Sequence, residues 1–203
     1  MEFHSPFRPD PKLTDHERRR RVVRLCCSFM RNLAFHRAGM QGDVQRSLLT
    51  ASHPRGAFWR EVHANFFDIC VLEWCKLFVD RNRQEWGEHH WRRVVDDTDR
   101  FEAALYASLK MTAGDFANLA TEIRHYRDKF VAHLDGERMM YPPVLEVPKC
   151  SVTFLFEHLS HHAHGNTDWQ GLPTAAEQLV FGYEQSSCEA ESVYAEALSS
   201  PSA

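Results

Sequence analysis

The stretch from Ala57 to Asp80, AFWREVHANFFDICVLEWCKLFVD, is apolar almost all the way round a helix. Such a helix has to be surrounded by other elements, because none of its faces can be left to water. The sequence therefore predicts a central helix wrapped by its neighbours. Glu73 is the exception, since it lies on the same side as Val62 and Phe66 and would be costly to bury without a positive partner.

Several other segments show the three-and-four spacing of apolar residues that is typical of amphipathic helices. The predicted helices span residues 15–37, 43–50, 88–110, 112–134 and 149–164, and a shorter one begins at Thr174. Thr14 with Glu17, and Thr112 with Asp115, have the form of helix-start caps. Neither a convincing alternating strand nor an internal repeat is visible. We therefore expect an all-α bundle of about five to six helices.

The length of the chain, 203 residues, suits one compact domain with its own core. We assign residues 14–183 to this helical domain. Residues 1–13 are rich in proline and are expected to form a flexible arm. Residues 184–203 are rich in Ser, Ala and Glu and are expected to form a polar, disordered tail.

No apolar run approaches the ~20 residues that a membrane-spanning helix needs, and the N-terminus is polar instead of signal-like. These features predict a soluble, cytoplasmic protein without a membrane partner. The formal net charge of -4 argues against a protein that coats nucleic acid by bulk electrostatics. A local basic face could still guide RNA, and the run ERRRRVVR, residues 17–24, is the candidate, with a solvated helix face as the alternative.

An arginine interrupts the apolar face of the helix predicted over residues 112–134. This face consists of Phe116, Leu119, Ala120, Ile123, Phe130, Val131 and Leu134, and Arg127 falls inside it. Because a guanidinium stays charged, either a carboxylate meets it or the surface it faces is a wet groove. In the first case Arg127 pairs with a buried acid such as Glu73 and only fixes the register of the helix. In the second, Arg127 and His133 face an anionic substrate.

An arginine and a histidine together are sufficient to cleave RNA without a metal or another cofactor. His133 would take the proton of a ribose 2′-hydroxyl for attack on the adjacent phosphate, and could later return it. Arg127 would hold the phosphate with its bidentate fork and stabilise the extra negative charge. The second case therefore predicts a metal-independent endoribonuclease.

The segment RDKFVAH, Arg127 to His133, resembles the signature of the HEPN superfamily. That signature is an arginine and a histidine separated by four to six residues, late in an all-helical bundle, commonly with a polar residue directly after the arginine. Asp128 fits this last position. The longer segment YRDKFVAHLD, together with LEWCKLF at residues 72–78 and HHW at residues 89–91, looks most like HEPN proteins of the abortive-infection, phage-resistance type. The resemblance spans roughly residues 15–135.

The resemblance implies a homodimer whose two signature helices meet across the dimer axis and build one composite site. Arg127 and His133 would be catalytic, Asp128 would position one of them, and RNA would be the substrate. The implied setting is phage defence or a toxin–antitoxin system, with an antitoxin as a further partner.

One HEPN subgroup carries a tyrosine two residues after the histidine, which partner nucleotidyltransferase antitoxins modify. This chain has Asp135 there, which argues against regulation by such a partner. Some HEPN proteins have lost catalysis, so the alternative function is a non-catalytic RNA-binding, nucleotide-binding or assembly module.

The segment EHLSHHAHGN, residues 157–166, raises the alternative of a metal site. His158 and His162 are one helical turn apart and could share an ion, and Glu157 with His161 offers a second pair of this kind. A firm site needs a third and a fourth ligand at defined spacing, and the sequence does not specify them. We favour a polar, solvated helix end and keep a metal on His158 and His162 as the alternative.

Overall fold

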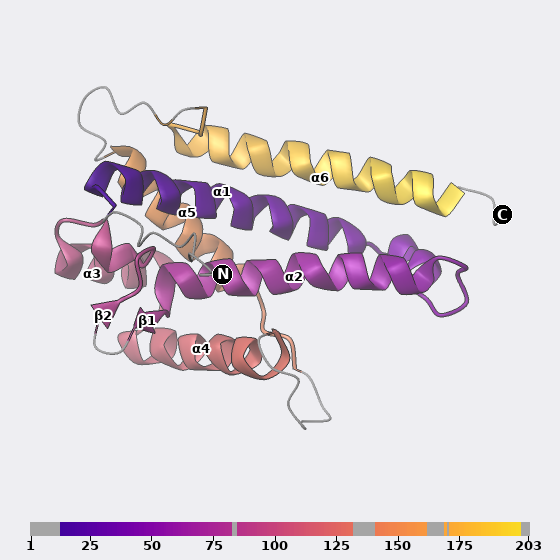
Figure 1. Cartoon of the computed structure of the whole chain (residues 1–203), viewed down its shortest axis with the longest axis horizontal. Helices are drawn as coiled ribbons and strands as arrows, with labels where there is room; N and C mark the ends of the chain where they lie inside the picture. The colour runs from indigo at the N-terminus through magenta and orange to yellow at the C-terminus, as the bar shows by residue number, and fades with distance from the viewer. Residues whose placement is uncertain (1–12, 83–84, 132–140, 162–168, 170, 200–203) are drawn as a thin grey trace, which may run out of the picture.

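The computed structural model describes residues 13–82, 85–131, 141–161, 169 and 171–199, and it is mostly helical (Figure 1). The helices are α1 (Asp15–Gly39), α2 (Gly56–Phe78), α3 (Thr98–Leu109), α4 (Ala113–Tyr126), α5 (Glu146–His161) and α6 (Ala176–Ser199). Short π-helical turns cover Val44–Leu48 and Arg127–Val131, a 3-10 turn covers Trp91–Arg93, and two-residue strands β1 (Arg81–Asn82) and β2 (Glu85–Trp86) pair antiparallel. Apart from this small ladder, the described part of the chain is all-α, as the sequence predicts.

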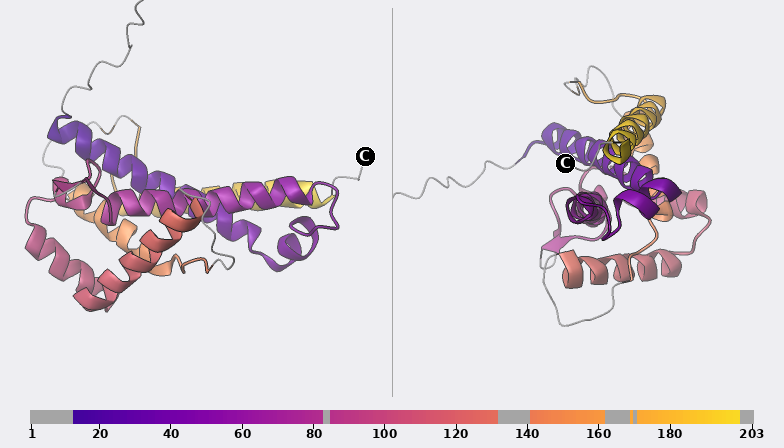
Figure 2. Two further views of the ribbon diagram at one scale, coloured as in Figure 1. Left: turned by 60° about the horizontal axis from the view of Figure 1, so that its bottom comes forward. Right: turned by 90° about the vertical axis from the view of Figure 1, so that its right-hand side faces the viewer.

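Three long helices lie side by side, and α1 packs against both α2 and α6 (Figure 1). Figure 2 shows that α3, α4 and α5 gather at the end of the molecule where α1 begins. Besides α1, α2 contacts α4 and the turn that follows α4, so the prediction of a central helix is confirmed for its second half. The prediction that no face of this helix is left to water is wrong for its first half, where Phe58 is 62% exposed. Among the described helices, none combines the length and the apolar character needed to pass through a lipid bilayer.

Most of the buried side chains form one continuous core around α2. Trp74 is the largest fully buried side chain, and its indole N–H donates to Ser151 Oγ at 2.9 Å, which ties α2 to α5. A smaller cluster joins the end of α1 to the Val44–Leu48 turn and to α6.

The last helix, α6, continues to Ser199, so the prediction of a disordered tail is wrong for residues 184–199. Ser186, Ala190 and Tyr194 follow one another at the four-residue spacing of a single helix face, and all three are buried. Ala190 and Tyr194 belong to the smaller apolar cluster at the end of α1. Packing of this face stabilises a segment whose composition alone resembles that of a disordered chain. Residues 1–12 and 200–203 lie outside the described residues.

The prediction of one helix over residues 88–110 is wrong in its first half. The β1–β2 ladder precedes this segment, and the 3-10 turn and an irregular stretch occupy it up to α3. His90 and Asp97 each accept a backbone N–H with the side chain, and they begin the 3-10 turn and α3 respectively. These local hydrogen bonds compete with a continuous helix. Trp91 is nevertheless buried, as its apolar character indicates.

A capping box fixes the start of α4. Thr112 Oγ1 accepts the backbone N–H of Asp115 at 3.1 Å, and Asp115 Oδ2 accepts the backbone N–H of Thr112 at 3.1 Å. We expect Thr112→Ala to lower the free energy of unfolding by about 1 kcal/mol in urea denaturation, because α4 loses the hydroxyl that accepts the backbone N–H of Asp115. Ser108→Ala, at an exposed site near the end of α3, is the control and should change stability by less than about 0.5 kcal/mol. Equal losses in the two variants would contradict the role of the cap.

Candidate functional site

The segment RDKFVAH, residues 127–133, begins where α4 ends. After Tyr126 the chain continues as the π-helical turn Arg127–Val131. Buried Phe116 and Ile123 belong to the apolar face of α4, as the sequence predicts. His133 and Asp135 lie outside the described residues.

Arg127 contacts two carboxylates, and the one of Asp80 links the end of α4 to the end of α2. Its Nε donates to Asp128 Oδ1 at 2.8 Å, and its Nη1 donates to Asp80 Oδ1. Burial on its own would lower the pKa of Arg127, but the two carboxylates outweigh it and raise the pKa. The side chain is 19% exposed, so the guanidinium is a fixed cation at the edge of the core. Neither carboxylate contact uses Nη2. The acid that meets Arg127 in the chain is thus Asp80, and not Glu73.

Two arginines and two aspartates gather at this corner. Burial raises the pKa of the Cys75 thiol to about 12, and Arg127, Asp80, Asp128 and Arg124 all act on that thiol from nearby. Both aspartates pair with Arg127, and neither is in contact with Arg124. An arriving phosphate therefore has to displace a carboxylate to gain the full charge of Arg127.

Glu73 is buried in the middle of α2 with 7% of the residue exposed. Its Oε2 has no hydrogen-bond partner in the described part of the chain. Burial raises the pKa of Glu73 to about 7, and Ser28, Lys76 and Arg31 oppose this only in part. Burial thus disfavours the charged form of Glu73, and the ion pair with Arg127 that would offset this is not formed, because Arg127 pairs with Asp80 and Asp128.

Tyr126, the last residue of α4, lies in the core. Its ring packs edge-on against Phe67 with the centroids 5.5 Å apart, and its hydroxyl donates to Asp68 Oδ1 at 3.1 Å. Burial and the neighbouring Asp68 raise the pKa of Tyr126 well above its usual value. Tyr126 is therefore a neutral anchor between α4 and α2 at physiological pH.

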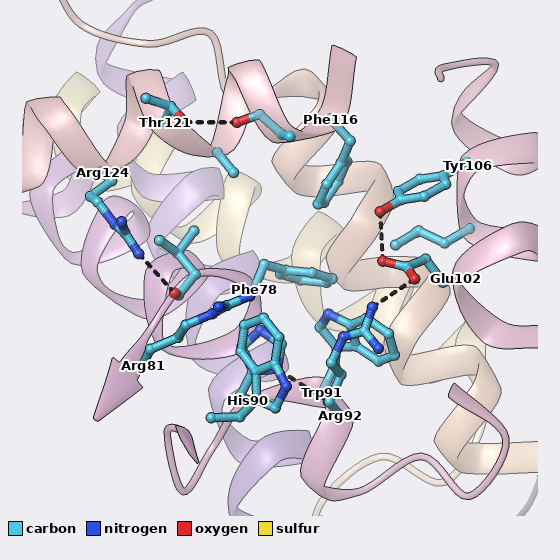
Figure 3. Close-up of a pocket in the computed structure, with 15 residues that line it drawn as sticks. Phe78, Arg81, His90, Trp91, Arg92, Glu102, Tyr106, Phe116, Thr121 and Arg124 are labelled. Atoms are coloured by element: carbon cyan, nitrogen blue, oxygen red, sulfur yellow. Dashed lines mark hydrogen bonds and ion pairs between the residues drawn. The ribbon is translucent and has the colours of Figure 1, made fainter. Parts of the chain in front are cut away.

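A pocket of about 370 Å³ opens between the β1–β2 ladder, α3 and α4 (Figure 3). Its walls combine three arginines, Arg81, Arg92 and Arg124, with aromatic rings. Sequence reasoning missed this pocket, because Arg81 becomes the neighbour of Trp86 only through the pairing of β1 with β2. The one available signal was Arg124, one helical turn before Arg127.

The histidine-rich segment forms no metal site in the part of the chain that the structure describes. His158 lies edge-on to Phe101 of α3 with the ring centroids 4.9 Å apart, and His161 is the last residue of α5. No group of three or more potential ligands occurs among the described residues. His162 lies outside them, so the pair of His158 and His162 stays a prediction.

The basic run at the start of α1 is partly neutralised. Arg18 pairs with Asp15 at 2.8 Å and with Glu88 at 3.3 Å, and Arg19 pairs with Asp96 at 2.7 Å. These contacts tie α1 to the segment between β2 and α3. The solvated, structural interpretation of the run therefore accounts for at least two of its arginines.

The chain matches no known protein family, no curated protein and no solved structure.

Proposed function

We propose that this chain is a HEPN-like, metal-independent endoribonuclease of phage defence or of a toxin–antitoxin system. In this proposal it acts as a homodimer, and Arg127 and His133 form the catalytic site. The observation that carries the proposal is the state of Arg127, which is partly exposed, fixed by Asp80 and Asp128, and placed in the turn that leads to His133. A guanidinium that is already ordered loses little further side-chain entropy when it binds a phosphate.

The cleavage step uses the 2′-hydroxyl of the RNA itself. His133 takes its proton, the 2′ oxygen forms a bond to the adjacent phosphorus, and the bond from phosphorus to the 5′ oxygen of the next nucleotide breaks. A protonated histidine of the paired site returns a proton to the departing oxygen. Arg127 stabilises the negative charge that develops on the phosphate oxygens. The products are a 2′,3′-cyclic phosphate and a 5′-hydroxyl.

The two aspartates have different roles in this reaction. Asp128 holds Nε and orients the plane of the guanidinium, so it is a positioning residue. Asp80 holds Nη1 and competes with the phosphate for it. Nη2 and, after exchange with Asp80, Nη1 can then form the two parallel hydrogen bonds that arginine makes to phosphate.

The products and the metal requirement test the proposal directly. Wild-type protein incubated with total RNA in a chelator should cleave it and leave 2′,3′-cyclic phosphate ends. A short RNA with a single 2′-deoxynucleotide at the mapped cleavage site should resist cleavage there, because the nucleophile is missing. Cleavage that requires a divalent metal, or that proceeds at the deoxynucleotide, would refute the mechanism. If no RNA is cleaved at all, the proposed ribonuclease activity is refuted.

A second candidate is a non-catalytic HEPN-type module that binds RNA or mediates assembly. The observation that favours it is the balanced charge around Arg127, since Asp80 and Asp128 already satisfy the guanidinium. In this case Arg127 ties α4 to α2. The purified chain would then retain intact RNA in a binding assay.

A further inference from the structure

Two arginines, Arg81 and Arg124, stand on the same side of the pocket in Figure 3. Arg81 lies opposite Trp86 in the β1–β2 ladder, with its guanidinium carbon 3.7 Å from the centroid of the indole ring. Arg124 comes from α4 and donates from Nη2 to the carbonyl oxygen of Val79 at 3.3 Å. Neither arginine has a carboxylate partner among the described residues. Both are held in place by neutral groups, so their charge remains available to a ligand.

The third arginine of the pocket is already neutralised. Arg92 pairs with Glu102 at 2.6 Å, and Tyr106 donates its hydroxyl to the same carboxylate at 2.7 Å. Glu102 is the one carboxylate among the lining residues, against three arginines. The pocket therefore carries a net positive charge, and this charge is concentrated on the side of Arg81 and Arg124.

His90 adds no positive charge to the pocket. It is 1% exposed, and its ring stacks on Trp86 with the centroids 4.1 Å apart. Its Nδ1 accepts the backbone N–H of Arg92 at 3.2 Å, so the proton of the neutral ring is on Nε2. Burial lowers the pKa of His90 to about 3, which keeps the ring neutral at physiological pH. The role of His90 is to hold Trp86, and through it Arg81, in position.

Another side of the pocket is apolar. Phe78 at the end of α2 and Phe116, Ala117 and Ala120 of α4 line it. The volume, about 370 Å³, lies near the lower end of the range for small-molecule sites. A ligand that fits both sides has one anionic group and one flat, apolar body of the size of a nucleobase.

We propose that this pocket binds a nucleoside monophosphate, with the phosphate on Arg81 and Arg124 and the base against Phe116. Arginine forks suit phosphate, and aromatic faces stack on bases of any identity. The proposal goes beyond the ribonuclease function, because it involves neither Arg127 nor His133 and requires no bond to be broken. The same chemistry is offered by a free mononucleotide and by the 5′-phosphorylated end of an RNA.

Direct binding to the full chain tests the proposal. AMP, GMP, CMP and UMP are titrated into the wild-type protein and followed by calorimetry and by tryptophan fluorescence, since Trp86 and Trp91 line the pocket. We expect saturable binding of at least one of them, and a dissociation constant at least about tenfold higher for Arg81→Ala and for Arg124→Ala. Arg100→Ala, an exposed arginine of α3 outside the pocket, is the matched control and should bind like the wild type. Both pocket arginines are exposed, and thermal melts establish that their variants fold.

Further ligands show how much the phosphate and the nucleoside each contribute to binding, and whether the phosphate belongs to a free nucleotide or to an RNA end. The unphosphorylated nucleoside and inorganic phosphate should each bind at least about tenfold more weakly than the nucleotide. A short RNA with a 5′-phosphate, compared with the same RNA carrying a 5′-hydroxyl, shows whether an RNA end occupies the pocket. The proposal is overturned if neither a mononucleotide nor the 5′-phosphorylated RNA binds saturably. Wild-type affinity in both pocket variants, or equal affinity for nucleoside and nucleotide, would also overturn it.

Discussion

His133→Ala is expected to lower the rate of RNA cleavage by about 100-fold or more, because the reaction loses the group that moves its protons. Arg127→Ala should cause a loss of similar size, since a single donor that stabilises transition-state charge contributes about 100-fold to 1,000-fold. The measurement is the single-turnover cleavage rate of a short RNA in the presence of a chelator. Cleavage by His133→Ala at the wild-type rate would contradict the proposed mechanism.

The structural role of Arg127 has to be separated from its chemical role. Arg127→Ala breaks the contact between Arg127 and Asp80, and the free energy of unfolding should fall by about 1 kcal/mol. Asp80→Asn weakens the same contact but keeps the guanidinium and its bond to Asp128. We expect Asp80→Asn to destabilise the fold comparably and to retain cleavage. If both variants lose cleavage in proportion to their loss of stability, Arg127 acts only by linking α4 to α2.

Arg127→Lys adds a test of geometry at constant charge. Lysine carries the same charge but lacks the planar fork, so it cannot form two parallel bonds to a phosphate while bonded to Asp128. A cleavage rate at least about tenfold below the wild-type rate is expected. Wild-type activity in this variant would show that a point charge is sufficient and would contradict the bidentate contact.

The amphipathic helices could be predicted from periodicity because each buries one face along its own length, and α2 could be predicted from its nearly continuous apolar character. Local signals gave the start of α4 at Thr112, where the capping box forms as expected. The β1–β2 ladder could not be predicted in this way, since two residues a strand are too few for an alternating pattern. The extent of α6 depends on the partner face of α1, which the sequence of α6 alone does not contain.

In the candidate site, too, the sequence predicts the features that depend on neighbouring residues in the chain and does not predict those that depend on tertiary packing. The sequence indicates that Arg127 interrupts an apolar face and needs an anion. Whether the anion is Glu73 or Asp80 depends on the position of α4 along the axis of α2, and side-chain periodicity does not determine that position. The pocket of Arg81 and Arg124 was missed for the same reason, because strand pairing and helix packing bring its arginines together.

Glu73→Gln is expected to raise the free energy of unfolding at pH 8 by on the order of 3 kcal/mol and to change it little near pH 4. Burial raises the pKa of Glu73 from 4.5 to about 7 in the folded chain. Between these values the unfolded chain releases the proton while the folded chain keeps it, so stability falls as the pH rises and is constant above about pH 8. One pKa unit corresponds to about 1.4 kcal/mol, which gives the magnitude. Glutamine has nearly the same shape and does not ionise.

Two histidines make the stability depend on pH in the opposite direction. Their effect has to be separated from the effect of Glu73. Burial lowers the pKa of His90 to about 3 and that of His63 to about 4. Their contribution to stability is complete above pH 6.5 and is lost as the pH falls through the folded values. Because both histidines are present in wild type and variant, their effect cancels in the difference between the two unfolding free energies.

That difference, measured by urea denaturation from pH 4 to pH 8, should grow with pH and level off above pH 7. Glu61→Gln, at an exposed site on the same helix, should give a difference within about 0.5 kcal/mol throughout. A difference for Glu73→Gln that does not vary with pH would show that the buried carboxyl keeps its ordinary pKa.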